Sequence, residues 1–97
     1  MAKRRRAARK PARLMIEEHR AGLSLGAIFA IWHAGWVLFV AAGIGDAFIA
    51  WISGVHMLTN PYTVLAFDAT AAVIGLIGAF ICGYITGWIF AAIWNRV

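Results

Sequence analysis

The stretch ATAAVIGLIGAFICGYITGWIFAAIW, residues 69–94, decides the fold of this chain because it is long, apolar and free of formal charge. About 20 consecutive apolar residues are enough for a helix to cross a bilayer, so the stretch predicts a transmembrane helix. Small residues recur at every fourth position and share one helical face; they are Ala71, Gly75, Ala79, Gly83, Gly87 and Ala91. Small faces let helices approach closely in lipid, so we expect this one to pack against a protein helix.

The composition excludes an ordinary soluble domain. Of the 97 residues, 63% are hydrophobic and 13% are charged, whereas soluble domains carry about 25% charged residues. The only cysteine, Cys82, lies inside the apolar stretch and has neither an intrachain disulfide partner nor metal-ligand spacing. The sequence contains no catalytic constellation, phosphate loop or metal motif. We therefore predict one small integral membrane unit that is not an enzyme and binds no metal.

A second apolar run covers residues 23–43 and repeats the same spacing of small residues. The small residues with this spacing are Gly22, directly before the run, and Gly26, Ala30 and Ala34 within it. Two helices with matching small faces, joined by one connection, predict an all-α membrane fold: a two-span hairpin over residues 21–97 with spans at 23–43 and 69–94. Trp36, Phe39 and Val40 fall on another side, toward lipid or a larger partner.

The positive charge is concentrated at the ends of the sequence. Eight of the nine Lys and Arg residues lie in the first twenty positions, and the ninth is Arg96. The positive-inside rule therefore predicts that both termini are cytoplasmic. Residues 1–20 are expected to form a basic arm and a juxtamembrane helix starting at Pro11, with Arg13 and Glu17 spaced for an ion pair. Residues 17–20 form a polar collar before the membrane.

Three roles are open for the basic arm. Its cationic residues are Lys3, Arg4, Arg5, Arg6, Arg9 and Lys10. They act as a topology determinant that also lies on anionic lipid headgroups, or dock onto an acidic patch of a partner subunit, or bind nucleic acid. The last role is disfavoured because the arm lacks interleaved aromatic residues.

The connection over 44–67 predicts an interfacial segment that begins with an amphipathic helix over 44–60. Apolar residues at helical spacing place Trp51 at the level of the lipid headgroups, and Trp94 with Arg96 suggests an anchor at the other interface. Asp46 is expected to cap this helix. Asp46 and His56 are too far apart along one helix to share a metal ion.

The end of the connection contains two further signals. Asn60 and Pro61 indicate a turn or a helix start. Asp68 precedes the second span and is expected to cap it; a proton-carrying carboxylate is the alternative.

His33 lies at the centre of the first span, where an ionisable residue suggests a function. One interpretation is a neutral imidazole hydrogen-bonded across the helix pair, to Thr86 or a carbonyl. Another is an axial ligand of a haem or chlorin, with the small residues around it leaving room for the macrocycle. A third is the polar lining of a pore or proton path. We expect no cofactor, and a haem or chlorin at His33 is the alternative.

The second half resembles a family of small two-pass prokaryotic membrane proteins often described as bacteriophage-holin-like. The residues that carry the resemblance are Gly75, Gly78, Phe80, Gly83, Tyr84, Ile85, Gly87, Ile89, Phe90, Ala91, Trp94 and Asn95. The resemblance implies a two-pass hairpin in the prokaryotic inner (cytoplasmic) membrane and no catalytic residue. The long basic arm and His33 depart from the family's pattern.

These observations favour a non-catalytic accessory or assembly subunit of a larger membrane complex, whose partners are anionic lipids and other membrane subunits or further copies. A holin-like self-associating pore is the first alternative. The second is a pigment- or haem-binding subunit that uses His33.

Overall fold

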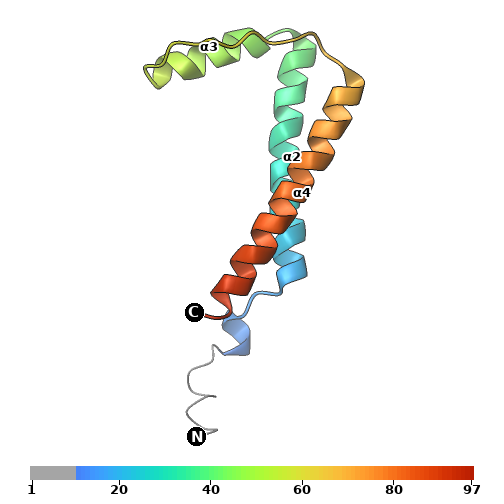
Figure 1. Ribbon diagram of the computed structural model, residues 1–97, viewed down its shortest axis with the longest axis vertical. Helices are drawn as coiled ribbons and strands as arrows, with labels where there is room; N and C mark the ends of the chain where they lie inside the picture. The colour runs from blue at the N-terminus through green and yellow to red at the C-terminus, as the bar shows by residue number, and fades with distance from the viewer. Residues whose placement is uncertain (1–10) are drawn as a thin grey trace, which may run out of the picture.

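The computed structural model describes residues 11–97. Within this range the chain consists of helices and connecting segments, with no strand. The elements are the 3-10 turn η1 (Ala12–Leu14) and the α-helices α2 (Glu18–Ala42), α3 (Gly45–Val55) and α4 (Ala69–Trp94) (Figure 1). The predicted all-helical class is therefore confirmed for the described part of the chain.

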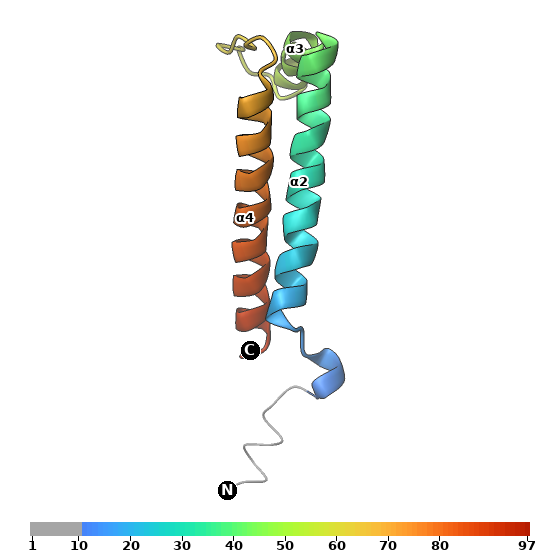
Figure 2. The same cartoon turned by 90° about the vertical axis from the view of Figure 1, so that its right-hand side faces the viewer.

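The long helices α2 and α4 lie side by side and run in opposite directions (Figures 1 and 2). Both are long and apolar enough to cross a membrane. At 1.5 Å per residue, helices of 25 and 26 residues extend about 37–39 Å, which exceeds a hydrocarbon core of about 30 Å. In the most apolar stretch of each helix, only 6% and 11% of the residues, respectively, are buried inside the protein. Most apolar side chains therefore point outward, unlike those of a soluble core helix.

The start of α2 is fixed by Glu17, which makes the polar collar the first turn of the helix. The Glu17 carboxylate accepts hydrogen bonds from the backbone N–H groups of His19, at 3.1 Å, and Arg20, at 3.2 Å. Within residues 11–97 it makes no ion pair with Arg13, so that predicted pair is wrong. The predicted juxtamembrane helix is likewise reduced to η1. The other end of α2 is closed by Gly43, whose φ of 81° favours glycine.

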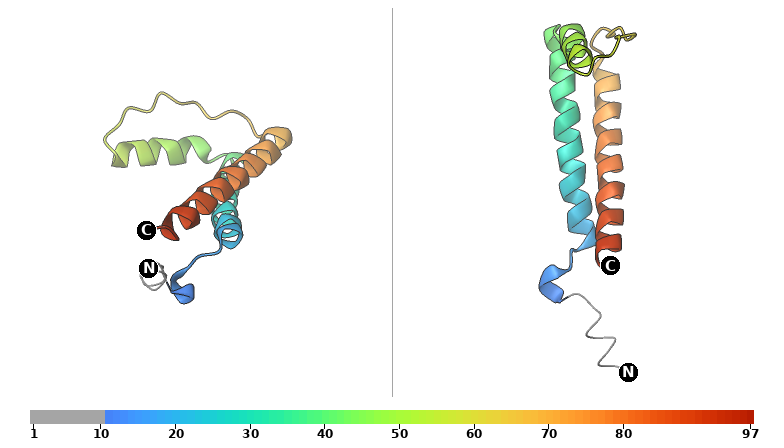
Figure 3. Two further views of the ribbon diagram at one scale, coloured as in Figure 1. Left: turned by 60° about the horizontal axis from the view of Figure 1, so that its bottom comes forward. Right: turned by 90° about the vertical axis from the view of Figure 1, so that its left-hand side faces the viewer.

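The helix α3 projects to one side from the end of α2 (Figures 1 and 3). It is shorter than the amphipathic helix expected from the sequence, because it ends at Val55 and Met57 then takes a left-handed φ of 58°. Its N-cap residue is Ile44, and no side chain caps it. The prediction that Asp46 caps α3 is therefore wrong.

Aromatic contacts hold α3 against the end of α2. The Phe48 ring lies 5.1 Å from Phe39 and 6.3 Å from Trp36, measured between ring centroids. Trp51 continues this cluster at 6.3 Å from Phe48. The cluster uses the aromatic side of α2 that the sequence separates from its small-residue face.

The segment 56–68 returns to α4 without forming a helix. Asn60 Oδ1 accepts a hydrogen bond from Tyr62 N–H at 2.9 Å, which makes a local turn, so a helix start at Pro61 is wrong. Asp46 Oδ1 accepts a hydrogen bond from Val64 N–H at 2.9 Å. Asp46 therefore ties the returning segment to α3 in place of capping α3.

The predicted cap of α4 is confirmed: Asp68 accepts a hydrogen bond from Thr70 N–H at 3.1 Å. We expect Asp68→Ala to lower the free energy of unfolding by about 1 kcal/mol, because the first turn loses its acceptor. Asp68→Asn retains an acceptor and should stay close to wild type. Thermal unfolding in mild detergent measures both. Equal losses in the two variants would show that the carboxylate charge, and not the cap, stabilises this end.

Candidate functional site

The contact between α2 and α4 is formed by the predicted small residues, but only over part of its length. The buried positions are Gly22, Gly26, Gly83, Gly87 and Ala91. Ala30, Ala34, Gly75 and Ala79 are half-buried, and Ala71 is exposed. The helices are therefore in closest contact toward the end that carries the C-terminus, and they leave more space toward α3.

Backbone meets backbone at the closest part of this contact. A Cβ atom added at Gly83 would overlap the carbonyl oxygen of Leu25 and lie 2.8 Å from Gly26 Cα. One added at Gly87 would overlap the carbonyl oxygen of Ala21 and lie 3.0 Å from Gly22 Cα. Such distances leave no room for a methyl group, and backbone atoms cannot rotate away as a side chain can. Glycine is therefore required at both positions for this approach.

Two aromatic side chains of α4 cover the glycines of α2. Cβ atoms added at Gly22 and Gly26 would lie 2.7 Å from the Tyr84 ring and 2.9 Å from the Phe80 ring. The Tyr84 hydroxyl also forms a 2.8 Å hydrogen bond with His19 Nδ1, which links the first turn of α2 to α4. The sequence reasoning missed this arrangement, although the i, i+4 spacing of Phe80 and Tyr84 places them on one helical face.

The end of α4 holds the segment before α2 through hydrogen bonds that we call the Trp94–Asn95 clamp. Asn95 Oδ1 accepts from Ile16 N–H at 2.9 Å, and Asn95 Nδ2 donates to the Ile16 carbonyl at 2.7 Å. Trp94 Nε1–H donates to the Leu14 carbonyl at 2.6 Å. Ile16 lies between η1 and α2, where no helix satisfies its backbone groups. The clamp supplies those missing partners.

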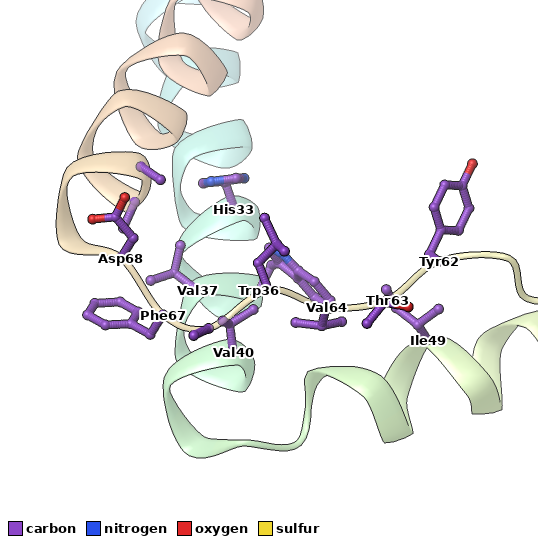
Figure 4. Close-up of a pocket in the computed structure, with 14 residues that line it drawn as sticks. His33, Trp36, Val37, Val40, Ile49, Tyr62, Thr63, Val64, Phe67 and Asp68 are labelled. Atoms are coloured by element: carbon purple, nitrogen blue, oxygen red, sulfur yellow. The ribbon is translucent and has the colours of Figure 1, made fainter.

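His33 is half-buried and extends from α2 toward α4 (Figure 4). A Cβ atom added at Gly75 would overlap His33 Nε2, so this ring nitrogen lies against the glycine backbone. The side chain makes no hydrogen bond within residues 11–97. Thr86, which was expected as a partner, instead donates its hydroxyl to the Cys82 carbonyl at 2.7 Å. A metal-centred macrocycle does not fit between Nε2 and Gly75, so an axial-ligand role through Nε2 requires the ring to rotate.

Two apolar hollows meet at His33. The first, of about 460 Å³, lies between α2 and the returning segment (Figure 4). Its walls include Trp36, Val40, Val64 and Phe67, and Asp68 lies at its edge.

The second hollow, of about 1060 Å³, lies along α2 beneath α3 and also reaches Ala79 of α4, and we call it the α2–α3 groove. Its lining includes Trp32, Gly35, Trp36, Phe39, Phe48 and Ile52. Trp32 is 83% exposed, which makes its indole available to lipid or to another protein.

The chain matches no protein-family model, no curated protein and no solved structure. The resemblance to the holin-like family therefore stays a prediction.

The described residues offer apolar packing surfaces and few polar side chains that face a neighbour. Among residues 11–97, no three His, Cys, Asp or Glu side chains gather into a group that fits a metal ion. The hydroxyl of Ser24 donates to the Arg20 carbonyl of its own helix at 2.9 Å, as Thr86 does to Cys82, so neither extends polarity toward a neighbour. Trp51 is exposed on α3, and the arm residues Lys3–Lys10 lie outside the described residues.

Proposed function

We propose that the chain spans a prokaryotic inner (cytoplasmic) membrane as a two-span hairpin, with both termini cytoplasmic and α3 in the outer interface. Two outward-facing apolar helices need a non-aqueous surrounding, and no Lys or Arg lies between them. The basic N-terminal residues and Arg96 belong on the cytoplasmic side by the positive-inside rule. The apolar side chains of α3, Trp51 among them, suit the headgroup region at the other side.

We further propose that this hairpin is a non-catalytic accessory or assembly subunit of a larger membrane complex. The observation that carries the proposal is the α2–α3 groove. The small faces of the two long helices already contact each other, so the remaining recognition surface is aromatic and concave. Lipid tails give helices no hydrophobic reason to associate, so partners in a membrane are selected by shape and close packing. A groove with α3 above it suits one apolar helix of another subunit.

A holin-like pore is less well supported by the same geometry. A water-filled path needs a polar stripe along a helix, and the hydroxyls of Ser24 and Thr86 are turned to their own backbone. The glycine contact also brings the two helices too close together to leave a channel between them. Self-association would have to use the outer faces, where apolar side chains dominate.

Gly35 offers a sharp test, because it lines the groove while an added Cβ there would meet nothing within 4 Å. We expect Gly35→Leu to leave the thermal stability of the isolated chain unchanged. It should nevertheless reduce recovery of the partner subunits about tenfold, because the leucine occupies the groove. Gly54→Leu is the matched control, since Gly54 is equally open and lies on α3 outside the groove lining.

The measurement is native mass spectrometry of the complex purified from its own membrane in mild detergent. A heteromeric mass that is lost in Gly35→Leu and kept in Gly54→Leu supports the accessory role at this groove. A heteromer retained by Gly35→Leu would place the partner elsewhere, and a purely homomeric mass would favour the pore. Visible absorption of the same sample tests for a pigment or haem at His33.

A further inference from the structure

The Trp94–Asn95 clamp brings the two basic parts of the sequence to one end of the molecule. Arg13 precedes Leu14, whose carbonyl accepts from Trp94, and Arg96 follows Asn95, which binds Ile16. η1 and the C-terminus accordingly lie at the same end, opposite α3 (Figure 2). Residues 1–10 join this end at Pro11. The clamp therefore places the attachment of the basic arm beside the cationic end of α4.

The acidic groups at this end do not pair with these arginines. The Glu17 carboxylate is held by two backbone N–H groups at the start of α2, and Glu18 Oε1 accepts from Asn95 Nδ2 at 3.2 Å. Both carboxylates lie at the N-terminus of α2, where they offset the positive end of the helix dipole. Within residues 11–97, Arg13, Arg20 and Arg96 form no ion pair. Their charges are available to an external anion.

The surroundings of these arginines suit a lipid surface better than a soluble ligand. Leu14 and Met15 are each 46% exposed beside Arg13, and Val97 is 82% exposed beside Arg96. Apolar side chains next to cations are typical of segments that lie in the headgroup region. The opposite end has Asp46 and Asp68 and no Lys or Arg. The two ends thus differ in the sign of their charge.

We propose that this end, with Arg13 and Arg96 brought together by the Trp94–Asn95 clamp and Arg20 in the first turn of α2, is a binding face for anionic phospholipid headgroups. The inference rests on the proposed membrane orientation and names the lipid partner of that arrangement. Asn95 is a positioning residue: it carries no charge, and it fixes the segment that bears Arg13. Its loss should weaken lipid selectivity although the net charge is unchanged.

The test uses the full chain in zwitterionic detergent, titrated with phosphatidylglycerol or phosphatidylcholine and followed by native mass spectrometry. We expect a preference for phosphatidylglycerol. In the double variant Arg13→Gln/Arg96→Gln, the ratio of phosphatidylglycerol to phosphatidylcholine binding should fall roughly fivefold for each arginine removed. The reason is that a basic residue near the surface contributes about 1 kcal/mol. Asn95→Ala should reduce the preference by a similar order, whereas Asn60→Ala, at the opposite end, should not. Competition with glycerol phosphate distinguishes a lipid surface from a free-phosphate site.

Because Asn95→Ala alters packing as well, the arginine double variant, which removes no hydrogen bond within the described chain, is the decisive one. If the arginine double variant prefers phosphatidylglycerol as strongly as wild type does, the proposal is overturned. Equal displacement of both lipids by glycerol phosphate would also overturn it. Retention of RNA or of an acidic protein in place of lipid would do the same and would redirect the arm to those partners. Recovery of partner subunits is scored separately, so loss of lipid selectivity with an intact heteromer leaves the accessory role standing.

Discussion

Replacing both Gly83 and Gly87 with isoleucine is expected to separate α2 from α4 while leaving each of them helical. Both positions face backbone atoms of α2 that an added Cβ would overlap. Overpacking a close contact costs about 1–3 kcal/mol per site, and two adjacent sites cost about 2–6 kcal/mol, a large part of the stability of a small protein. Each span can remain helical alone in detergent because its backbone hydrogen bonds are internal.

The separation is best measured as a distance between the helices. Ser24 and Ile85 are exposed and lie close to the level where Gly83 meets Leu25. Spin labels on cysteines at these two positions, in a Cys82→Ser background, should give a short, narrow distance distribution in wild type. The distribution should be long and broad in the double isoleucine variant. Far-UV circular dichroism should change little.

Gly78→Ile is the matched control on the same helix. An added Cβ at Gly78 meets nothing within 4 Å, so the isoleucine points away from α2 and the distance should be preserved. If Gly78→Ile separates the helices as strongly as the double variant does, the effect comes from replacing glycine in α4 generally. If the double variant keeps the wild-type distance, the glycine contact is not what joins the helices.

Local sequence patterns predict the long helices of this protein and the glycines between them. The apolar runs and the four-residue spacing depend on one helix at a time, and they place the long helices and the glycines that meet. The cap at Asp68 is equally local. Each of these predictions needs only the periodicity of a helix and the chemistry of its ends.

Most of the missed contacts join residues far apart in the chain, although the cap of α2 by Glu17 is local. Asn95 and Ile16 are 79 positions apart, and Asp46 and Val64 are 18 apart. An Asn after a helix, or an Asp in the first turn of one, can hydrogen-bond to several nearby backbone groups. Only the tertiary structure determines whether it instead binds a distant residue. Asp46 was assigned to its own helix for that reason. The looser contact at exposed Ala71 and half-buried Ala79 was missed because spacing gives a shared face but not the angle between two helices.

Gly75→Ala should destabilise the helix pair by about 1–3 kcal/mol, because the new methyl group meets the His33 imidazole. The same substitution in a His33→Ala background should be nearly neutral, since the ring that it overlaps is gone. The difference is the coupling free energy of the pair, obtained from a double-mutant cycle by thermal unfolding in mild detergent. Gly78→Ala, in open space on the same helix, should have little effect in either background.

This cycle also separates the interpretations of His33. If the imidazole only packs against Gly75, His33→Leu should lower the free energy of unfolding only slightly. The coupling free energy should then account for most of the stability lost in Gly75→Ala. If it holds a pigment or haem, His33→Leu should abolish visible absorption, and Gly75→Ala should disturb that absorption by moving the ring. If Gly75→Ala lowers stability as much in the His33→Ala background as in wild type, the contact between Gly75 and the imidazole is contradicted. A glycine opposite a histidine would then serve close helix approach, as Gly83 and Gly87 do, and His33 would need a partner from outside the chain.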